Sequence, residues 1–124
     1  MTPLLSRRLE CVLALVRPCA VLADVGTDHA LLAVAAVCRG VAQRAIAADL
    51  REAPLCGARA HIARMGVTAQ VVAVRQDGLS GMEPGGVDAV VIAGMTPSHF
   101  MFGFFMFWKI GTSFEFQDNL RSLW

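Results

Sequence analysis

Apolar residues follow two patterns along the first 95 positions of the chain, helical spacing and short continuous runs. Between residues 5 and 16 they fall at helical spacing, with charged side chains on the opposite face, which predicts an amphipathic helix. Thr2 and Pro3 are typical of the start of such a helix, and Pro18 is expected to end it. Residues 20–25 follow as a short, continuous apolar run, which is typical of a buried strand.

The alternation of helix and strand continues to residue 95. Three more apolar runs predict strands at 44–50, 69–75 and 87–94, and two more helices are expected, at 30–38 and from Pro54 to a stop at Gly66. Strands that alternate with helices indicate a parallel sheet with right-handed crossovers. Because the strands are apolar almost throughout, they fit a sheet covered by helices on both faces. We therefore predict an α/β protein with a Rossmann-like fold.

Composition changes abruptly after residue 95. All seven Phe and both Trp lie at or after Phe100, and Lys109 is the only lysine. We interpret residues 1–95 as one unit, in which function is to be sought, and residues 96–124 as a Phe-rich tail from a different sequence source. A frameshifted or misassembled reading frame would explain this break.

Charge and cysteine content exclude several classes of protein. The 124 residues carry a formal net charge of +1 and have a mean hydropathy of +0.55, which excludes a disordered chain. The four cysteines form no CxxC pair, so no metal site is predicted. Six arginines between residues 39 and 75 give a mild basic face, which alone does not indicate RNA binding. No run reaches the roughly 20 apolar residues that span a bilayer, so we expect a cytoplasmic protein with reduced thiols.

Ligands of parallel α/β sheets bind where the strands end. Four predicted strand ends carry polar residues or glycine, at 24–29, 49–50, 77–79 and 93–95. Gly26 lets the backbone approach a ligand closely, and the free N–H groups of the helix that begins near His29 suit a carboxylate or a phosphate. Asp49 ends the second strand, where its carboxylate can accept both hydroxyls of a ribose. This set predicts a nucleoside cofactor, either S-adenosyl-L-methionine (SAM) or a dinucleotide.

The turn after the first strand favours SAM over NAD. A dinucleotide fingerprint requires three glycines (G-x-G-x-x-G), whereas here Gly26 stands alone, with Asp28 and His29 in place of the later glycines. An acidic side chain repels a pyrophosphate but attracts the ammonium group of SAM. Each residue also has a purely structural explanation: the aspartates can cap helices, His29 can be an ordinary first-turn histidine, and His61 a surface residue.

Six segments of the first part match one family in order. They are LSRRLECV (5–12), ADVGTDHALL (23–32), AIAADL (45–50), APLCGARAHIARMGV (53–67), VRQDGL (74–79) and DAVVIAGM (88–95). Residues 5–95 thereby resemble the start of the bacterial tRNA (adenine-22-N1)-methyltransferase family, of the TrmK type. The resemblance implies that residues 1–95 are the N-terminal part of a truncated class I SAM-dependent methyltransferase domain. It also implies methyl transfer from SAM to N1 of an adenine in tRNA.

The resemblance further implies which residues bind SAM. By position these are Asp24, Gly26, Asp28, His29, Asp49, Leu50, Asp77, Gly78, Ala93, Gly94 and Met95. Adenine N1 lies on the Watson–Crick edge, so the base must be unpaired or splayed out before it reacts. Its lone pair can attack the methyl group directly, which leaves the enzyme to orient the two and to offset the resulting positive charge. Asp28 is the candidate catalytic residue for that charge.

The chain departs from the family after Met95. Thr96 and Pro97 stand where the family has a second glycine pair, and nothing later resembles it. We therefore expect an incomplete fragment that is inactive on tRNA; the alternatives are a non-catalytic half-domain that binds SAM weakly and a small NAD-binding module. With the first four strands in the order 3-2-1-4, the outer edge of the fourth would be open, and the tail would lie loosely over it or be poorly ordered. An open edge beside a Phe-rich tail predicts self-association, whereas no membrane contact is expected.

Overall fold

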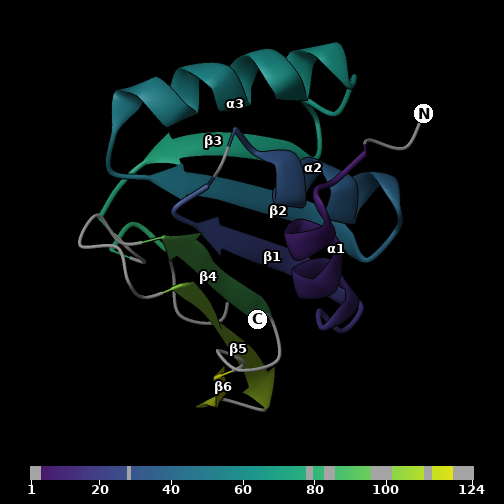
Figure 1. Ribbon diagram of the computed structural model, residues 1–124, viewed down its shortest axis with the longest axis vertical. Helices are drawn as coiled ribbons and strands as arrows, with labels where there is room; N and C mark the ends of the chain where they lie inside the picture. Colours follow the sequence, from purple (N-terminus) through teal and green to yellow (C-terminus); the bar gives the residue numbers. More distant parts are fainter. Residues whose placement is uncertain are drawn as a thin grey trace.

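The described residues form one mixed sheet and three helices (Figure 1). The computed structural model describes residues 4–27, 29–77, 80–82, 86–95, 102–110 and 113–118. The elements in chain order are α1 (Arg7–Ala14), β1 (Cys19–Val25), α2 (Leu31–Cys38), β2 (Ala42–Asp49), α3 (Glu52–Arg64), β3 (Val71–Arg75), β4 (Ala89–Met95), β5 (Phe102–Ile110) and β6 (Ser113–Asp118).

The strands lie in the order β3-β2-β1-β4-β5-β6. Strands β1 to β4 are parallel, and their predicted order and direction are confirmed. Parallel pairing brings their carboxyl ends to the same edge of the sheet. In the register, Val25 of β1 lies opposite Ala48 of β2 on one side and Ile92 of β4 on the other. Residues 19–95 therefore build one shared strand-end edge.

The tail pairs with the sheet, so the prediction of an open β4 edge is wrong. Strand β5 runs antiparallel to β4 along its whole length, from Ala89 opposite Trp108 to Met95 opposite Phe102, and β6 pairs antiparallel with β5. The physical reason is that the unpaired N–H and C=O groups of a strand edge gain hydrogen bonds from any extended segment within reach. A run rich in Phe has the intrinsic preference to be that segment. Because β5 covers the edge of β4, that edge gives no reason to expect self-association.

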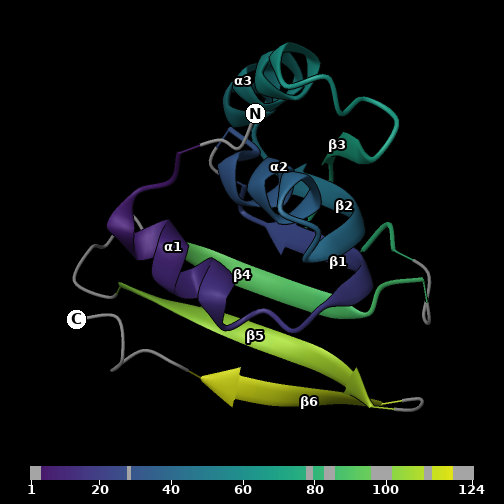
Figure 2. The ribbon, with the colours of Figure 1, turned by 90° about the vertical axis from the view of Figure 1, so that its right-hand side faces the viewer.

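The helices α1, α2 and α3 pack on one face of the sheet; α1 and α2 are drawn in front of its strands in Figure 1, and α1 lies to the left of β1 in Figure 2. The core forms between them and the strands, with members from each layer: Val12, Leu13, Leu22, Val34, Ala45, Ala58, Ile62, Val71 and Val91. Leu22 and Val12 are fully buried. This apolar contact holds the helices against the sheet.

We expected helices on both faces, and the described helices cover only one. The crossovers β1–α2–β2 and β2–α3–β3 step along the sheet in the same direction, so the right-handed rule puts both helices on the same face. The connection from β3 to β4 steps back, and a helix there would cover the other face. Its described parts, residues 76–77, 80–82 and 86–88, are not helical, because the segment is rich in turn residues.

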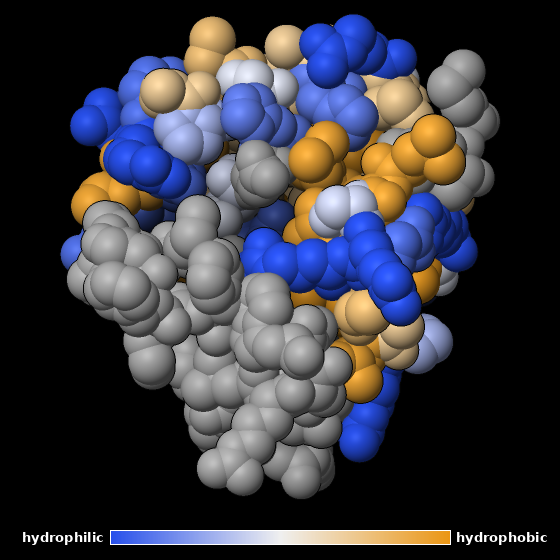
Figure 3. Space-filling model, in the orientation of Figure 1, coloured by the Kyte–Doolittle hydropathy of each residue, from blue (hydrophilic) through white to orange (hydrophobic). Residues whose placement is uncertain are grey.

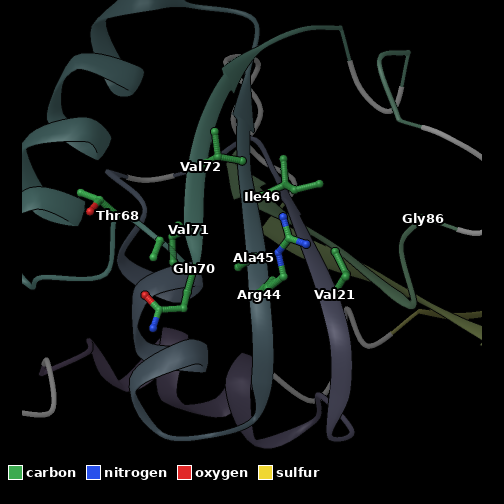
Figure 4. A pocket seen from close by; sticks show the side chains of 10 residues that line it. Val21, Arg44, Ala45, Ile46, Thr68, Gln70, Val71, Val72 and Gly86 are labelled. Atoms are coloured by element: carbon green, nitrogen blue, oxygen red, sulfur yellow. The ribbon is translucent and has the colours of Figure 1, made fainter.

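The second face has a smaller core and a shallow hollow. Ala23, Val87 and Val90 are buried there, with Ile46 and Met82 packed against them. On the same face Val72 is 53% exposed. A hollow of about 350 Å³ opens beside it (Figure 4), lined by Val21, Arg44, Ala45, Ile46, Thr68, Ala69, Gln70, Val71, Val72 and Gly86. Apart from Gly86, which precedes β4, these residues belong to the first halves of β1 and β2 and to the entry of β3, so the hollow lies away from the strand-end edge.

Helix α1 begins later than predicted. Its N-cap is Ser6, whose Oγ accepts a hydrogen bond from the Leu9 N–H at 3.2 Å. The predicted start at Thr2 and Pro3 lies outside the described residues, and the helix proper begins at Arg7.

Helix α1 is joined to the end of α2 by an ion pair. Glu10 of α1 accepts two hydrogen bonds of 2.7 Å from Arg39, just after α2, and these bonds hold the pKa of Glu10 below its usual value. Within the described segments, no helix is both long and apolar enough to cross a membrane.

Replacing Leu22 tests where the core lies. Its side chain is fully buried between the sheet and the helices, so Leu22→Ala should lower the free energy of unfolding by about 2–5 kcal/mol. Val72→Ala, on the exposed part of the other face, should cost less than about 1 kcal/mol. Urea denaturation followed by circular dichroism measures both. Equal losses would contradict a core between the helices and one face.

Candidate functional site

Two buried aspartates mark the strand-end edge. Asp24 stands one residue before the end of β1 and is 3% exposed, and Asp49 ends the neighbouring strand β2 and is 5% exposed. The turn that follows β1 is fastened to β2, because the N–H groups of Gly26 and Thr27 both donate to the carbonyl of Ala48, at 2.9 and 3.0 Å. Two carboxylates that the sequence separates by 25 positions are thus held on adjacent strands.

Thr27 organises the turn from inside. Its hydroxyl donates to Oδ2 of Asp24 at 2.9 Å and accepts a hydrogen bond from the Ala30 N–H at 3.1 Å. The side chain is 2% exposed. A buried carboxylate needs such a donor, since an unpaired one carries a large desolvation cost. We did not single out Thr27 from the sequence. The signal that could have identified it is a threonine three residues before the expected helix start at Ala30, where a hydroxyl can accept a hydrogen bond from a free N–H group.

Among the described residues of the turn, the backbone is left-handed at three positions. Gly26 has φ of 75°, and a methyl group added there would meet no heavy atom within 4 Å, so open space lies over it. His29 and Ala30 have φ of 51° and 59°, which costs roughly 1–2 kcal/mol for each residue that has a Cβ. Ala30 is the N-cap of α2 and supplies no side-chain cap. The first N–H groups of α2 can therefore serve an anionic ligand group.

Asp49 uses one carboxylate oxygen for its own loop. Oδ1 accepts hydrogen bonds from the N–H of Arg51 at 2.8 Å and from Nε of Arg51 at 3.3 Å. Both hydrogen bonds that the described residues give this carboxylate go to Oδ1. The Arg51 side chain is 75% exposed, so the ion pair adds little. One carboxylate oxygen of Asp49 thus has a purely structural role, because it binds the loop that follows β2.

The other predicted site residues lie after β2 and β3 and at the end of β4. Leu50 is 59% exposed, and its carbonyl accepts a hydrogen bond from Nε of Arg75 at 2.9 Å. Asp77 is exposed, and its carbonyl accepts the Ser80 N–H at 3.0 Å in a turn. The positions 93–95 end β4, opposite residues 102–104 of β5. Asp28 and Gly78 lie outside the described residues. The edge brings together the ends of β1, β2 and β4, whereas Asp77 belongs to the loop beyond β3.

Two histidines lie near each other, His29 in the turn after β1 and His61 in helix α3. His29 is exposed, and its imidazole lies against Gly57 of α3. His61 of α3 is half-buried rather than on the exposed side as expected, and its buried Nε2 has no hydrogen-bond partner within the described residues. Burial lowers the pKa of His61, and the charges of Arg64 and His29 lower it further. The two imidazoles are therefore close enough to interact.

Hydrophilic side chains gather over α3, along the upper margin of the helix side in Figure 3. An exposed ion pair joins Arg59 to Glu52 at 2.6 Å on this helix. Among the described residues, no group of three His, Cys, Asp or Glu side chains could hold a metal ion. The edge therefore offers carboxylates, backbone N–H groups and a glycine as its binding groups.

Comparison with known proteins gives this edge a context. Residues 5–101 match the family model of a methyltransferase domain. The chain is 36% identical over 91 residues to the tRNA (adenine(22)-N(1))-methyltransferase of Bacillus subtilis, a match that covers 73% of this chain and 38% of the relative. The chain thus spans less than half the length of this curated relative.

Solved structures show the same fold. The crystal structure of the B. subtilis M1A22 tRNA methyltransferase TrmK superposes with a TM-score of 0.70 at 36% identity, covering 74% of this chain and 39% of that one. Sp1610 of Streptococcus pneumoniae, a putative tRNA (m1A22) methyltransferase, gives 0.70 at 35% identity, with 74% and 42% covered. A structure of Sp1610 in complex with SAM gives 0.66 at 24% identity, with 76% and 57% covered.

Replacing Thr27 tests the internal support of the turn. Thr27→Val keeps the shape of the side chain but removes the hydroxyl that joins Asp24 to Ala30. It should lower the free energy of unfolding by about 1–3 kcal/mol, because the buried carboxylate of Asp24 loses the hydrogen bond from Thr27. Thr27→Ser keeps the hydroxyl and serves as the control. A valine variant as stable as the wild type in urea denaturation would remove Thr27 from this role.

Proposed function

Since the chain belongs to the methyltransferase domain family, we propose that the strand-end edge of its sheet binds S-adenosyl-L-methionine. The observation that carries this proposal is the pair of buried carboxylates, Asp24 and Asp49, at the ends of adjacent parallel strands, beside a glycine turn and an uncapped helix N-terminus. The SAM complex of Sp1610, which has the same fold, supports it.

The residues of the edge suit the chemical groups of SAM. Asp49 would accept the ribose hydroxyls through Oδ2, since Arg51 occupies Oδ1. The open space over Gly26 and the first N–H groups of α2 suit the carboxylate of the methionine part. Asp28, which follows Thr27 in the sequence, would attract its ammonium group. We assign the remaining contacts to Asp24, His29, Leu50, Asp77, Gly78, Ala93, Gly94 and Met95.

We further propose that the acceptor is N1 of an adenine in tRNA, which is the reaction that names the B. subtilis relative. When bound, SAM supplies an electrophilic methyl group on a sulfonium. Adenine N1 has its own lone pair, so no general base is needed before the transfer. The part of this chain is to hold the methyl donor in line and to offset the positive charge that the adenine gains, for which we propose the carboxylate of Asp28.

This chain would carry the cofactor half of that activity. It spans 38% of the B. subtilis relative, and we propose that recognition of tRNA depends on residues beyond the matched part. The chain alone would then bind SAM in the cytoplasm without methylating tRNA. The competing proposal, a non-catalytic half-domain that binds SAM weakly, predicts the same behaviour of the isolated chain, so a chimera is needed to separate them.

A chimera tests the catalytic lineage. Residues 5–95 would replace the matching segment of the B. subtilis enzyme, and methyl transfer from SAM to unmodified tRNA would be followed by mass spectrometry of the digested nucleosides. We expect 1-methyladenine with the chimera and none with the chain alone. A chimera that folds and binds SAM but leaves tRNA unmodified would contradict the tRNA proposal.

Asp49→Ala tests the cofactor proposal. A charged hydrogen-bonding group of this kind contributes roughly 1.5–3 kcal/mol, so the affinity for SAM should fall about ten- to a hundredfold in isothermal titration calorimetry. Asp49→Asn keeps an acceptor for the Arg51 N–H and reports on loss of charge alone. Glu52→Ala removes a nearby exposed carboxylate and should leave the affinity unchanged. Unchanged affinity in Asp49→Ala would remove Asp49 from the site.

A further inference from the structure

Gly57 of α3 is not among the residues assigned to the cofactor, yet it contacts the turn that follows β1. A methyl group added at Gly57 would have the imidazole of His29 as its nearest neighbour, with Nε2 at 2.8 Å and Cγ at 3.1 Å. These distances are shorter than van der Waals contact, which for carbon begins near 3.5 Å. Any side chain at position 57 would therefore occupy the space that the ring now fills.

The helix itself does not require this glycine. Gly57 lies in the interior of α3 and does not have a left-handed φ. Glycine at such a position destabilises a helix relative to alanine. The contact with His29 is the feature in the structure that explains why position 57 has no side chain.

The ring contact supports a turn that needs support. His29 and Ala30 both hold a left-handed φ although each has a Cβ, and such backbone persists only where the surroundings fix it. On the inner side, Ala30 is fully buried and its N–H donates to Thr27. On the outer side, His29 is exposed, and its ring lies on α3 at Gly57. Gly57 therefore provides the outer support.

This support also links two parts of the candidate site. The turn carries Gly26 and leads into α2, whereas α3 begins three residues after Asp49. His61 lies one helical turn beyond Gly57 on the same side of α3, and the charge of His29 lowers its pKa, as expected for neighbouring rings. The imidazole of His29 thus lies against the face of α3 that carries both residues.

We propose that Gly57 is a positioning residue: its missing side chain forms a seat for the His29 imidazole, which holds the turn of residues 26–30 in its ligand-binding shape. The proposal rests on the proposed function for its effect on SAM, but the seat itself is a property of the chain without ligand. Its two consequences can therefore be measured separately.

The first measurement concerns the turn without ligand. Gly57→Ala should speed amide hydrogen exchange at Gly26, Thr27 and Ala30, whose N–H groups hold the turn to Ala48 and Thr27. The thermal midpoint should stay level or rise, because alanine favours the helix and the displaced ring can move into solvent. Unchanged exchange at all three amides would overturn the seat, whether or not the chain binds SAM.

The second measurement concerns SAM affinity, by isothermal titration calorimetry. Gly57→Ala should weaken binding by about five- to tenfold, the change that corresponds to releasing one strained residue. Ala60→Gly, at an exposed position of the same helix, should lower the thermal midpoint and leave the affinity unchanged. Gly57→Ala is thus expected to lower the affinity without lowering the stability, and Ala60→Gly to lower the stability without changing the affinity.

A double-mutant cycle identifies the ring as the mediator. His29→Ala removes the imidazole, so adding Gly57→Ala to it should change neither the affinity nor the exchange rates further. An equal loss from Gly57→Ala in both backgrounds would overturn the proposal, because the effect would not pass through His29. If Gly57→Ala fails to fold, His29→Ala alone must still speed exchange at the three amides. If the variants show the exchange effects but the wild-type chain binds no SAM, the proposed function is contradicted and the seat is left standing.

Discussion

The carbonyl of Ala48 is the point on which the candidate site depends. It accepts the N–H groups of both Gly26 and Thr27, so the turn after β1 is hydrogen-bonded to the end of β2 rather than only following its own strand. This keeps Asp24 and Asp49 at one edge of the sheet, on adjacent strands, with both side chains nearly buried. Parallel pairing of β1 and β2 makes the arrangement possible, because it brings both carboxyl ends to one edge.

The parts of the fold that could be predicted from sequence are those with strong local signals. The apolar runs that became β1 to β4 and the helical spacing of α3 place each element to within a few residues. Asp24, Gly26 and Asp49 could be predicted as edge residues because strand ends in a parallel sheet share one edge. The family resemblance and the fold agree on this part of the chain.

The parts that sequence reasoning missed depend on tertiary contacts. Thr27 and Gly57 carry no motif of their own; each acquires its role from a partner, Asp24 for the hydroxyl and His29 for the empty Cβ position. Strand β5 lacks regular alternation, and it is a strand because it pairs with the edge of β4. The single helical face likewise follows from the direction in which each crossover steps, which no local pattern encodes.

A calorimetric titration of the unmodified chain with SAM, and separately with NAD, tests the central claim most directly. The acidic turn with a single glycine and the buried Asp49 suit a ligand that has an ammonium group, a carboxylate and a ribose, and they do not suit a pyrophosphate. The account predicts saturable one-to-one binding of SAM and no measurable binding of NAD at the same concentrations. Binding of NAD that equals or exceeds that of SAM would contradict it, as would the absence of SAM binding by a chain shown to be folded.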